Sequence, residues 1–225
     1  MLNYLTEGLT RAKIELPEET LVRELRFLEE LLRWNKRVNL TSVHDSNEAI
    51  EKHLIDSLLV MPCLGRIKSI LDMGSGGGLP GIPLAIAEPE IKVDSIDSVG
   101  KKVHFQKHIK RLLQLDNFTV VQSRVEDLNS AGLGGKLYDL IICRAFTSLD
   151  TYIGFAAPWL KSGGRLLAMK GPEGCDEIIV ARETIQRLKL SNPLTIEYSL
   201  PFSAANRQII VIKKPKVCMS DDNRG

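Results

Sequence analysis

A chain of 225 residues is long enough for one substantial hydrophobic core, and 44% hydrophobic with 26% charged residues is ordinary for a globular protein. The net charge of +2 is too small to predict nucleic-acid binding, and no apolar run approaches the roughly 20 residues that cross a bilayer. No basic segment followed by an apolar one opens the chain, and its four cysteines include no C-x-x-C pair. We therefore expect a cytoplasmic protein with reduced thiols, no metal site and no membrane anchor.

The first 64 residues are expected to form a helical cap that belongs to the same domain as the rest of the chain. Pro-Glu-Glu at 17–19 suits the first turn of a helix. A stripe of leucines follows at helical spacing: Leu21, Leu25, Leu28 and Leu32. Residues 35–39 form a polar break, and a second helix is expected from about Asn47 to Val60.

From residue 65 the pattern changes to short apolar runs that alternate with helical stretches. The expected strands are 67–73, 91–96, 118–121, 139–143 and 165–169, and the expected helices are 80–87, 101–115, 149–160 and 173–188. This alternation predicts an α/β, Rossmann-like domain over 65–216, with a central, mostly parallel sheet and helices on both faces. Two more runs, 194–198 and 208–212, predict an antiparallel pair at one edge, and 217–225 is expected to be a disordered tail.

Residues 70–81, Ile-Leu-Asp-Met-Gly-Ser-Gly-Gly-Gly-Leu-Pro-Gly, lead an apolar strand into a glycine loop and then into a helix. Glycine lets a ligand approach the backbone closely, and the helix N-terminus adds free N–H groups. The loop fits the dinucleotide pattern G-x-G-x-x-G from Gly76 to Gly81, with Asp97 21 residues beyond Gly76. It fits better the first motif of class I methyltransferases, in which an acid, here Asp72, precedes G-x-G-x-G.

Candidate polar groups follow the next three strands. Asp97 ends the second strand, where a carboxylate accepts hydrogen bonds from ribose hydroxyls. Glu126 and Asp127, after the third strand, are either contacts of an adenine amino group or acids in the first turn of a helix. Arg144, after the fourth, suits the Hoogsteen edge of guanine, a phosphate or the cofactor. Cys143 lacks the preceding proline that is typical of cytosine-C5 enzymes, so we interpret it as a buried thiol.

The residues after the fourth strand also narrow the acceptor. The sequence Cys-Arg-Ala-Phe at 143–146 lacks the [DNS]-P-P-[YF] tetrapeptide of enzymes that methylate exocyclic amines of bases. An acceptor with its own lone pair, such as guanine N7, needs no base, and proximity and orientation supply most of the acceleration. Six basic residues against one acid between Lys101 and Arg124 are either a solvated helix face or a phosphate-contacting surface.

Seven segments, in order, resemble one bacterial family. They are Arg-Trp-Asn-Lys-Arg-Val-Asn-Leu-Thr at 33–41, His-Leu-Ile-Asp-Ser at 53–57, and the segments 74–81, 97–102, 122–126, 144–146 and 169–171. Together they make the chain closely resemble the RsmG family, also called GidB, over about residues 21–213. The resemblance implies methyl transfer from S-adenosylmethionine (AdoMet) to N7 of one guanine of 16S rRNA, in the small ribosomal subunit. We expect a monomer.

Carried over by motif, the resemblance implies roles for individual residues. The cofactor-binding set is Gly74, Gly76, Gly78, Leu79, Asp97, Val125, Glu126 and Arg144, and Arg144 is also the candidate catalytic residue. The expected rRNA-binding residues are Arg124, Lys170 and Arg207. The family often shows Arg-His before its last strand, whereas this chain has Arg207-Gln208 and therefore no histidine for that position.

The polar residues of the cap have two interpretations. Asn35, Asn39 and Thr41 are either caps and turn residues or part of a cover that closes over AdoMet and presents the acceptor base. His53 and Asp56, three residues apart on a helix, either pair with each other or a backbone group, or belong to that cover. Two other functions stay open: an NAD-dependent dehydrogenase, although no Tyr-x-x-x-Lys pair occurs, and a non-catalytic RNA-binding factor with a vestigial AdoMet fold.

Overall fold

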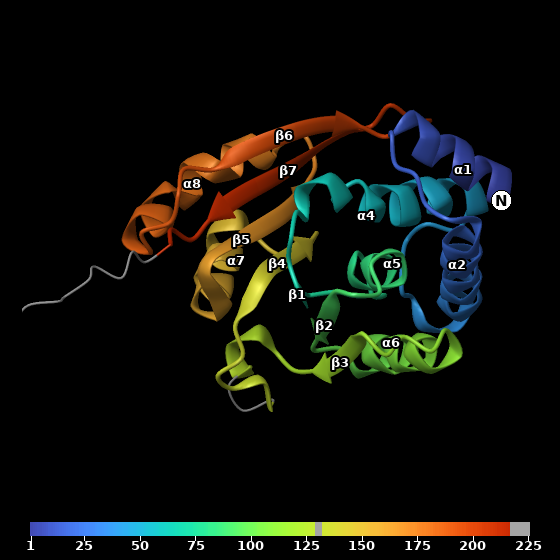
Figure 1. The fold of residues 1–225 in the computed structure, drawn as a ribbon, viewed down its shortest axis with the longest axis horizontal. Coiled ribbons are helices and arrows are strands. Elements are labelled where there is room, and N and C mark those ends of the chain that lie inside the picture. Colours follow the sequence, from blue (N-terminus) through green and yellow to red (C-terminus); the bar gives the residue numbers. More distant parts are fainter. Residues whose placement is uncertain (129–131, 217–225) are drawn as a thin grey trace, which may run out of the picture.

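The computed structural model describes residues 1–128 and 132–216 (Figure 1), so the expected tail at 217–225 lies outside the described residues. A seven-stranded sheet has the order β3-β2-β1-β4-β5-β7-β6. Its strands are β1 (Ser69–Met73), β2 (Lys92–Asp97), β3 (Phe118–Gln122), β4 (Tyr138–Arg144), β5 (Leu160–Lys170), β6 (Leu194–Ser199) and β7 (Asn206–Lys213). β1 to β5 pair in parallel, whereas β7 pairs antiparallel with β5 and β6. The predicted mostly parallel sheet with an antiparallel edge pair is confirmed.

Helices cover both faces of the sheet. They are α5 (Gly81–Ala87) and α6 (Gly100–Leu112) on one face, and α7 (Leu149–Ala156) and α8 (Gly174–Arg187) on the other (Figure 1). Side chains alternate across the central strand β4: Leu140 and Ile142 pack toward α5, α6 and the cap, whereas Ile141 and Cys143 pack toward α7 and α8. Because both faces are buried, β4 reads as a continuous apolar run rather than an alternating one.

The N-terminal cap packs on the α5 and α6 side of the sheet and shares its hydrophobic core. It contains α1 (Leu2–Arg11), which we did not predict, and α2 (Glu18–Val38). The predicted polar break at 35–39 is wrong, because α2 continues to Val38 and ends at Asn39 in the left-handed conformation. The predicted second helix is present as α3 (Ser46–Ala49), a π-helical turn η1 (Ile50–Ile55) and α4 (Asp56–Leu58).

Glu24 on α2 is fully buried, and neither of its carboxyl oxygens has a hydrogen-bond partner among the described residues. Burial raises the pKa of this carboxyl well above its ordinary value of 4.5. The folded state therefore keeps a proton that the unfolded chain has lost, so stability declines as pH rises above about 4.5.

We expect Glu24→Gln to weaken this decline, and Glu24→Leu to raise the free energy of unfolding at pH 7 by about 1–3 kcal/mol, since an unpaired polar group leaves the core. Guanidinium unfolding of the three proteins between pH 4.5 and 8 measures both effects. Parallel pH profiles for the wild type and Glu24→Gln would contradict the assignment to Glu24.

Candidate active site

Two cavities open side by side at the carboxyl ends of the parallel strands, where ligands of open α/β sheets bind. The first, of about 420 Å³, is lined by Gly74, Ile96, Asp97, Ser98, Val99, Lys102, Ser123, Arg124, Val125, Glu126, Ala145 and Phe146. The second, of about 530 Å³, is lined by Thr41, Ser42, Val43, Lys52, His53, Asp56, Arg144, Ala145, Met169, Lys170, Gly171, Glu177 and Arg207. Ala145 belongs to both walls.

Ala145 has a left-handed backbone, with φ of 47°. This conformation is costly for a residue with a side chain, and such strain tends to occur at functional sites. Ala145 directly follows β4, and on either side of it Arg144 lines the second cavity and Phe146 lines the first. A single strand end therefore supplies one wall residue to each cavity.

The glycine loop contributes Gly74 to the first cavity, whereas Gly76, Gly78 and Leu79 are not among the residues that line it. Gly74 has φ of 70°, and a Cβ built on it would lie 2.1 Å from Cδ2 of Phe146. Only glycine fits there without displacing the ring. Gly76 and Gly78 also have positive φ, of 58° and 86°, so they shape the loop behind the cavity.

Two carboxylates hold the glycine loop, and only one of them faces the first cavity. Asp97 accepts from the backbone N–H of Gly76 and of Val99, both at 2.8 Å, and lines the cavity. Asp72 is fully buried and accepts from the Gly81 N–H at 2.8 Å, while its Oδ1 has no partner among the described residues. Burial raises the pKa of Asp72 to about 7, against the opposing effects of the Gly81 N–H and Arg144. Asp72 therefore orders the glycine loop from within the protein core and does not line the first cavity.

A buried polar network that we did not predict supports the loop from below. The Gln106 side-chain amide donates to Ser75 Oγ and to the Gly76 carbonyl, both at 2.8 Å. Its carbonyl accepts from the Ser95 hydroxyl at 2.6 Å. Since all three side chains are buried and satisfied, the network fixes the loop rather than leaving it to rearrange on binding.

The far wall of the first cavity comes from the turn after β3. Val125 and Glu126, predicted as cofactor residues, line it from the short helical turn Val125–Asp127. Arg124, predicted to bind rRNA, lines the same cavity beside them. Lys102 of α6 also lines it, although we did not assign it a role.

The second cavity brings together four basic residues from distant parts of the sequence, namely Lys52, Arg144, Lys170 and Arg207. Lys170 donates to the Thr147 carbonyl at 2.7 Å and to Glu177 at 2.8 Å, so its charge is already paired. Arg144, predicted for the cofactor, contributes to this cavity and not to the first.

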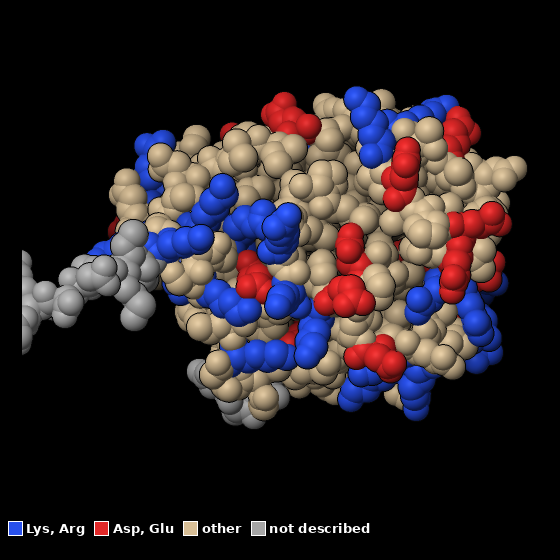
Figure 2. Space-filling view, viewed as in Figure 1, with Lys and Arg blue, Asp and Glu red and all other residues tan. Residues whose placement is uncertain are grey.

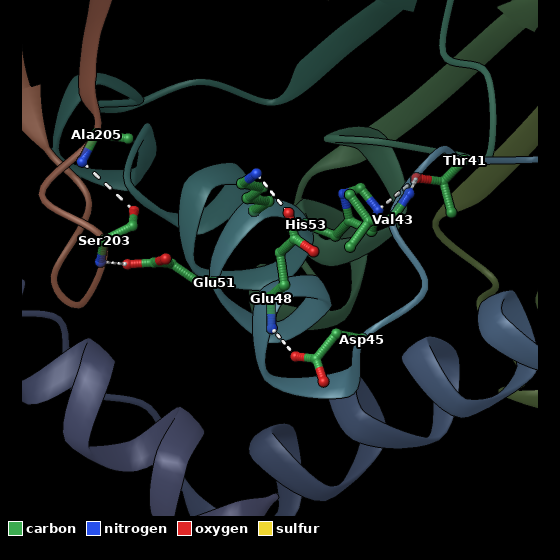
Figure 3. Close-up of polar contacts among 9 residues, drawn as sticks. Thr41, Val43, Asp45, Glu48, Glu51, His53, Ser203 and Ala205 are labelled. Atoms are coloured by element: carbon green, nitrogen blue, oxygen red, sulfur yellow. Dashed lines mark hydrogen bonds and ion pairs between the residues drawn. The ribbon is translucent and has the colours of Figure 1, made fainter.

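The cap closes the second cavity, and within it His53 and Asp56 do not pair with each other, which was one of our interpretations. His53 and Asp56 bind other partners: His53 Nε2 lies 2.7 Å from Thr41 Oγ1, which also accepts from the Val43 N–H at 3.1 Å (Figure 3). Burial, together with the charge of Arg144, lowers the pKa of His53 to about 4, so the imidazole is neutral at pH 7. Asn35 lies on α2, and its side chain accepts from two backbone N–H groups of the turn that follows this helix.

The comparisons with known proteins agree with this geometry. A family model described as GidB, rRNA small subunit methyltransferase G, matches residues 22–210. The chain belongs to this family. Proteins named ribosomal RNA small subunit methyltransferase G are 43% identical in Syntrophotalea carbinolica, over 95% of this chain and 98% of theirs, and 40% identical in Aromatoleum aromaticum, over 93% and 97%. Membership favours the methyltransferase interpretation of the glycine loop over the dehydrogenase one.

Solved structures confirm the predicted methyltransferase fold of this GidB-family chain. An O-methyltransferase from Bacillus cereus, in complex with SAH, superimposes with a TM-score of 0.61 at 16% identity, covering 95% of this chain and 100% of that one. Cofactor-bound Rv0187 from MTB superimposes with a TM-score of 0.61 at 17% identity, covering 85% and 90%. At these identities the likeness concerns the fold alone.

Other groups that the sequence singled out lie outside both cavities. Cys143 is buried against α7 and α8, as we predicted, and burial raises the pKa of its thiol. Over residues 1–128 and 132–216 no cluster of three His, Cys, Asp or Glu side chains is placed to hold a metal ion. Within the same residues no helix is both long and apolar enough to span a membrane.

Proposed function

We propose that this GidB-family protein transfers a methyl group from AdoMet to N7 of a single guanine in 16S rRNA of the small ribosomal subunit. The observation that carries the proposal is the pair of cavities that meet at Ala145. The first cavity has groups suited to AdoMet, and the second is lined by Arg144, which lies next to Ala145 at the carboxyl end of β4. Two ligands bound there would have their reacting atoms close together, which is the main requirement of a direct displacement.

The residues of the first cavity fit AdoMet. Asp97 offers carboxylate oxygens to ribose hydroxyls, and Glu126 offers acceptors for an adenine amino group. Gly74 leaves its backbone open to a ligand, while Arg124 and Lys102 supply positive charge for a carboxylate. When bound, AdoMet supplies an electrophilic methyl group on a sulfonium.

The second cavity fits a guanine whose N7 is left free to react. Arg144 uses Nη1 for contacts within the protein, and its other N–H groups are available to donate to guanine O6. His53 is neutral, so it adds no cation beside a base that gains positive charge on methylation. The lone pair of N7 needs no general base, and the protein residues have only to bind the base, orient it and exclude water.

The test is methyl transfer from labelled AdoMet to small ribosomal subunits that lack this modification, followed by mapping of the labelled nucleotide. Label at N7 of one guanine of 16S rRNA supports cofactor, acceptor and reaction together. Tight binding of AdoMet without label on rRNA would support AdoMet as the cofactor but would contradict the proposal that 16S rRNA is the acceptor. Preference for a dinucleotide over AdoMet would reject both.

We expect assembled small subunits to be far better substrates than a synthetic RNA loop of the same sequence. The net charge is only +2, and positive and negative side chains are interspersed over the face in Figure 2, with one group of Lys and Arg left of centre. Such a surface gives weak non-specific attraction to RNA, so shape must supply much of the affinity. Initial rates on the two substrates at equal concentration measure the difference, and equal rates would contradict the expectation.

A further inference from the structure

Arg144 is held in the second cavity through a single nitrogen. Nη1 donates to the Lys52 carbonyl at 2.7 Å and lies 3.4 Å from Asp56 Oδ2. Within the described residues no hydrogen bond from Nη2 or Nε is present, and the side chain is 18% exposed toward the cavity. Since a guanidinium is rigid and planar, fixing Nη1 from two sides also restricts where the remaining donors lie.

The Asp56 carboxylate is itself held between two donors. It is buried, with one oxygen near Arg144 and the other accepting from the Tyr198 hydroxyl at 2.9 Å. Burial and the nearby Asp56 charge raise the pKa of Tyr198, so its hydroxyl stays protonated and continues to donate. Asp56 thus joins the cap, the end of β4 and the edge strand β6.

The helical turn that precedes Asp56 is also held in place by hydrogen bonds. Lys52 lies in the π-helical turn η1, a rare element that is frequent at functional sites. In the same turn Glu51 accepts from the backbone N–H groups of Phe202 and Ser203, at 2.6 and 2.8 Å (Figure 3 shows the second). The β6–β7 connection is therefore attached to the cap, and β6 carries Tyr198 to Asp56.

We infer that Asp56 is a positioning residue for methyl transfer, which acts through Arg144 and is held by Tyr198; this inference rests on the proposed function. An arginine–carboxylate pair built for stability is commonly bidentate, and a buried ion pair is in any case weak evidence of a stability role. Here Asp56 meets one nitrogen only, which leaves the other donors of Arg144 for the acceptor base. The cap is then part of the active site rather than a cover over it.

Asp56→Asn tests the inference, with Asp139→Asn as the matched control. Asp139 is likewise paired with a basic residue, Lys161 at 2.9 Å, but it lies near the amino end of β4, whereas Arg144 is at the carboxyl end. Methylation of small subunits gives kcat and KM, and titration with AdoMet gives its Kd. We expect Asp56→Asn to lower kcat on the order of 10²-fold, as loss of orientation does, with AdoMet Kd unchanged. Asp139→Asn should lower stability and keep kcat.

The decisive comparison is the same substitution in an Arg144→Lys background. If Asp56 acts through Arg144, adding Asp56→Asn to Arg144→Lys lowers kcat by less than about 2-fold relative to Arg144→Lys alone, because the effects of coupled residues are not additive. A full 10²-fold loss in that background, or wild-type kcat for Asp56→Asn alone, would overturn the inference.

If Asp56→Asn does not fold, Tyr198→Phe decides by the same comparison. It keeps Asp56 and Arg144 and removes one hydrogen bond from the carboxylate. We expect a smaller fall in kcat, which the Arg144→Lys background abolishes; unchanged kcat, or an equal fall in both backgrounds, would overturn the inference. The wild-type protein in the same assay tests the proposed function. If the wild type does not methylate small subunits, the proposed function fails, whereas the inference about Asp56 fails only when the wild type is active and the variants behave as just described.

Discussion

Replacing Arg144 by alanine is expected to lower kcat for methylation of small subunits by about 10²–10³-fold, the usual effect of removing a positioned donor from an active site. The affinity for AdoMet should stay within a few-fold, because Arg144 lines the second cavity and not the first. This pattern, kcat lost and cofactor binding kept, separates an acceptor-binding role of Arg144 from the cofactor-binding role that the family resemblance also implied.

Arg144→Lys is the informative companion to the alanine variant. Lysine keeps a positive charge near Asp56 but lacks the planar fork, so it cannot hold the Lys52 carbonyl and the base in one fixed geometry. We expect its kcat to be nearly as low as that of Arg144→Ala, with better thermal stability, since the buried carboxylate keeps a cation. Wild-type turnover in both variants, measured per folded molecule, would remove Arg144 from the site.

The sheet and the glycine loop were predictable from local sequence, because each depends on residues close together in the chain. The apolar run that ends in Asp97 and the strand that leads into the glycines at 74–78 can each be predicted from the residues of that segment alone. Gly76, Gly78 and Leu79 belong to the same motif. Of this set only Gly74 is among the residues that line the first cavity, and a cofactor-binding role of the other three stays a prediction.

The contacts of the second cavity were not predictable, since they join segments far apart in sequence. Asp56 and Tyr198 are 142 residues apart, and Arg144 and Lys52 are 92 apart. The hydrophobic periodicity of the sequence predicts helices and strands, but it does not indicate which strands the cap contacts. A helical spacing of three therefore made His53 a plausible partner of Asp56, whereas tertiary packing gave each of them a partner from elsewhere.

Polarity misled the prediction for residues 35–39 for a related reason. Asn35 is buried on α2, a position that a polar side chain occupies only when it is satisfied. Its Oδ1 accepts from the N–H groups of Leu40 and Thr41, at 2.7 and 2.9 Å, and so the helix continues through it. The residue that looked like a helix break instead orders the turn that carries Thr41 to His53.

Gly74→Ala is expected to raise the Kd for AdoMet by at least about 10²-fold, as blocked access to a preformed site does. The added methyl group would lie 2.1 Å from Cδ2 of Phe146, far inside van der Waals contact, so the ring must move. Phe146 lines the first cavity, and a displaced ring competes with the cofactor for that space. The positive φ of 70° adds about 1–2 kcal/mol of backbone strain.

Gly154→Ala is the matched control for this substitution. Gly154 is exposed on α7, and a Cβ there would meet nothing within 4 Å, so alanine should stabilise the helix by about 0.5–1 kcal/mol and leave AdoMet binding unchanged. Calorimetric titration with AdoMet and thermal unfolding of both variants give the two quantities separately. If Gly74→Ala keeps the wild-type Kd although its stability falls, the cofactor does not occupy the space beside Phe146. The first cavity would then be the wrong site, whereas loss of binding in Gly74→Ala alone places AdoMet against the end of β1.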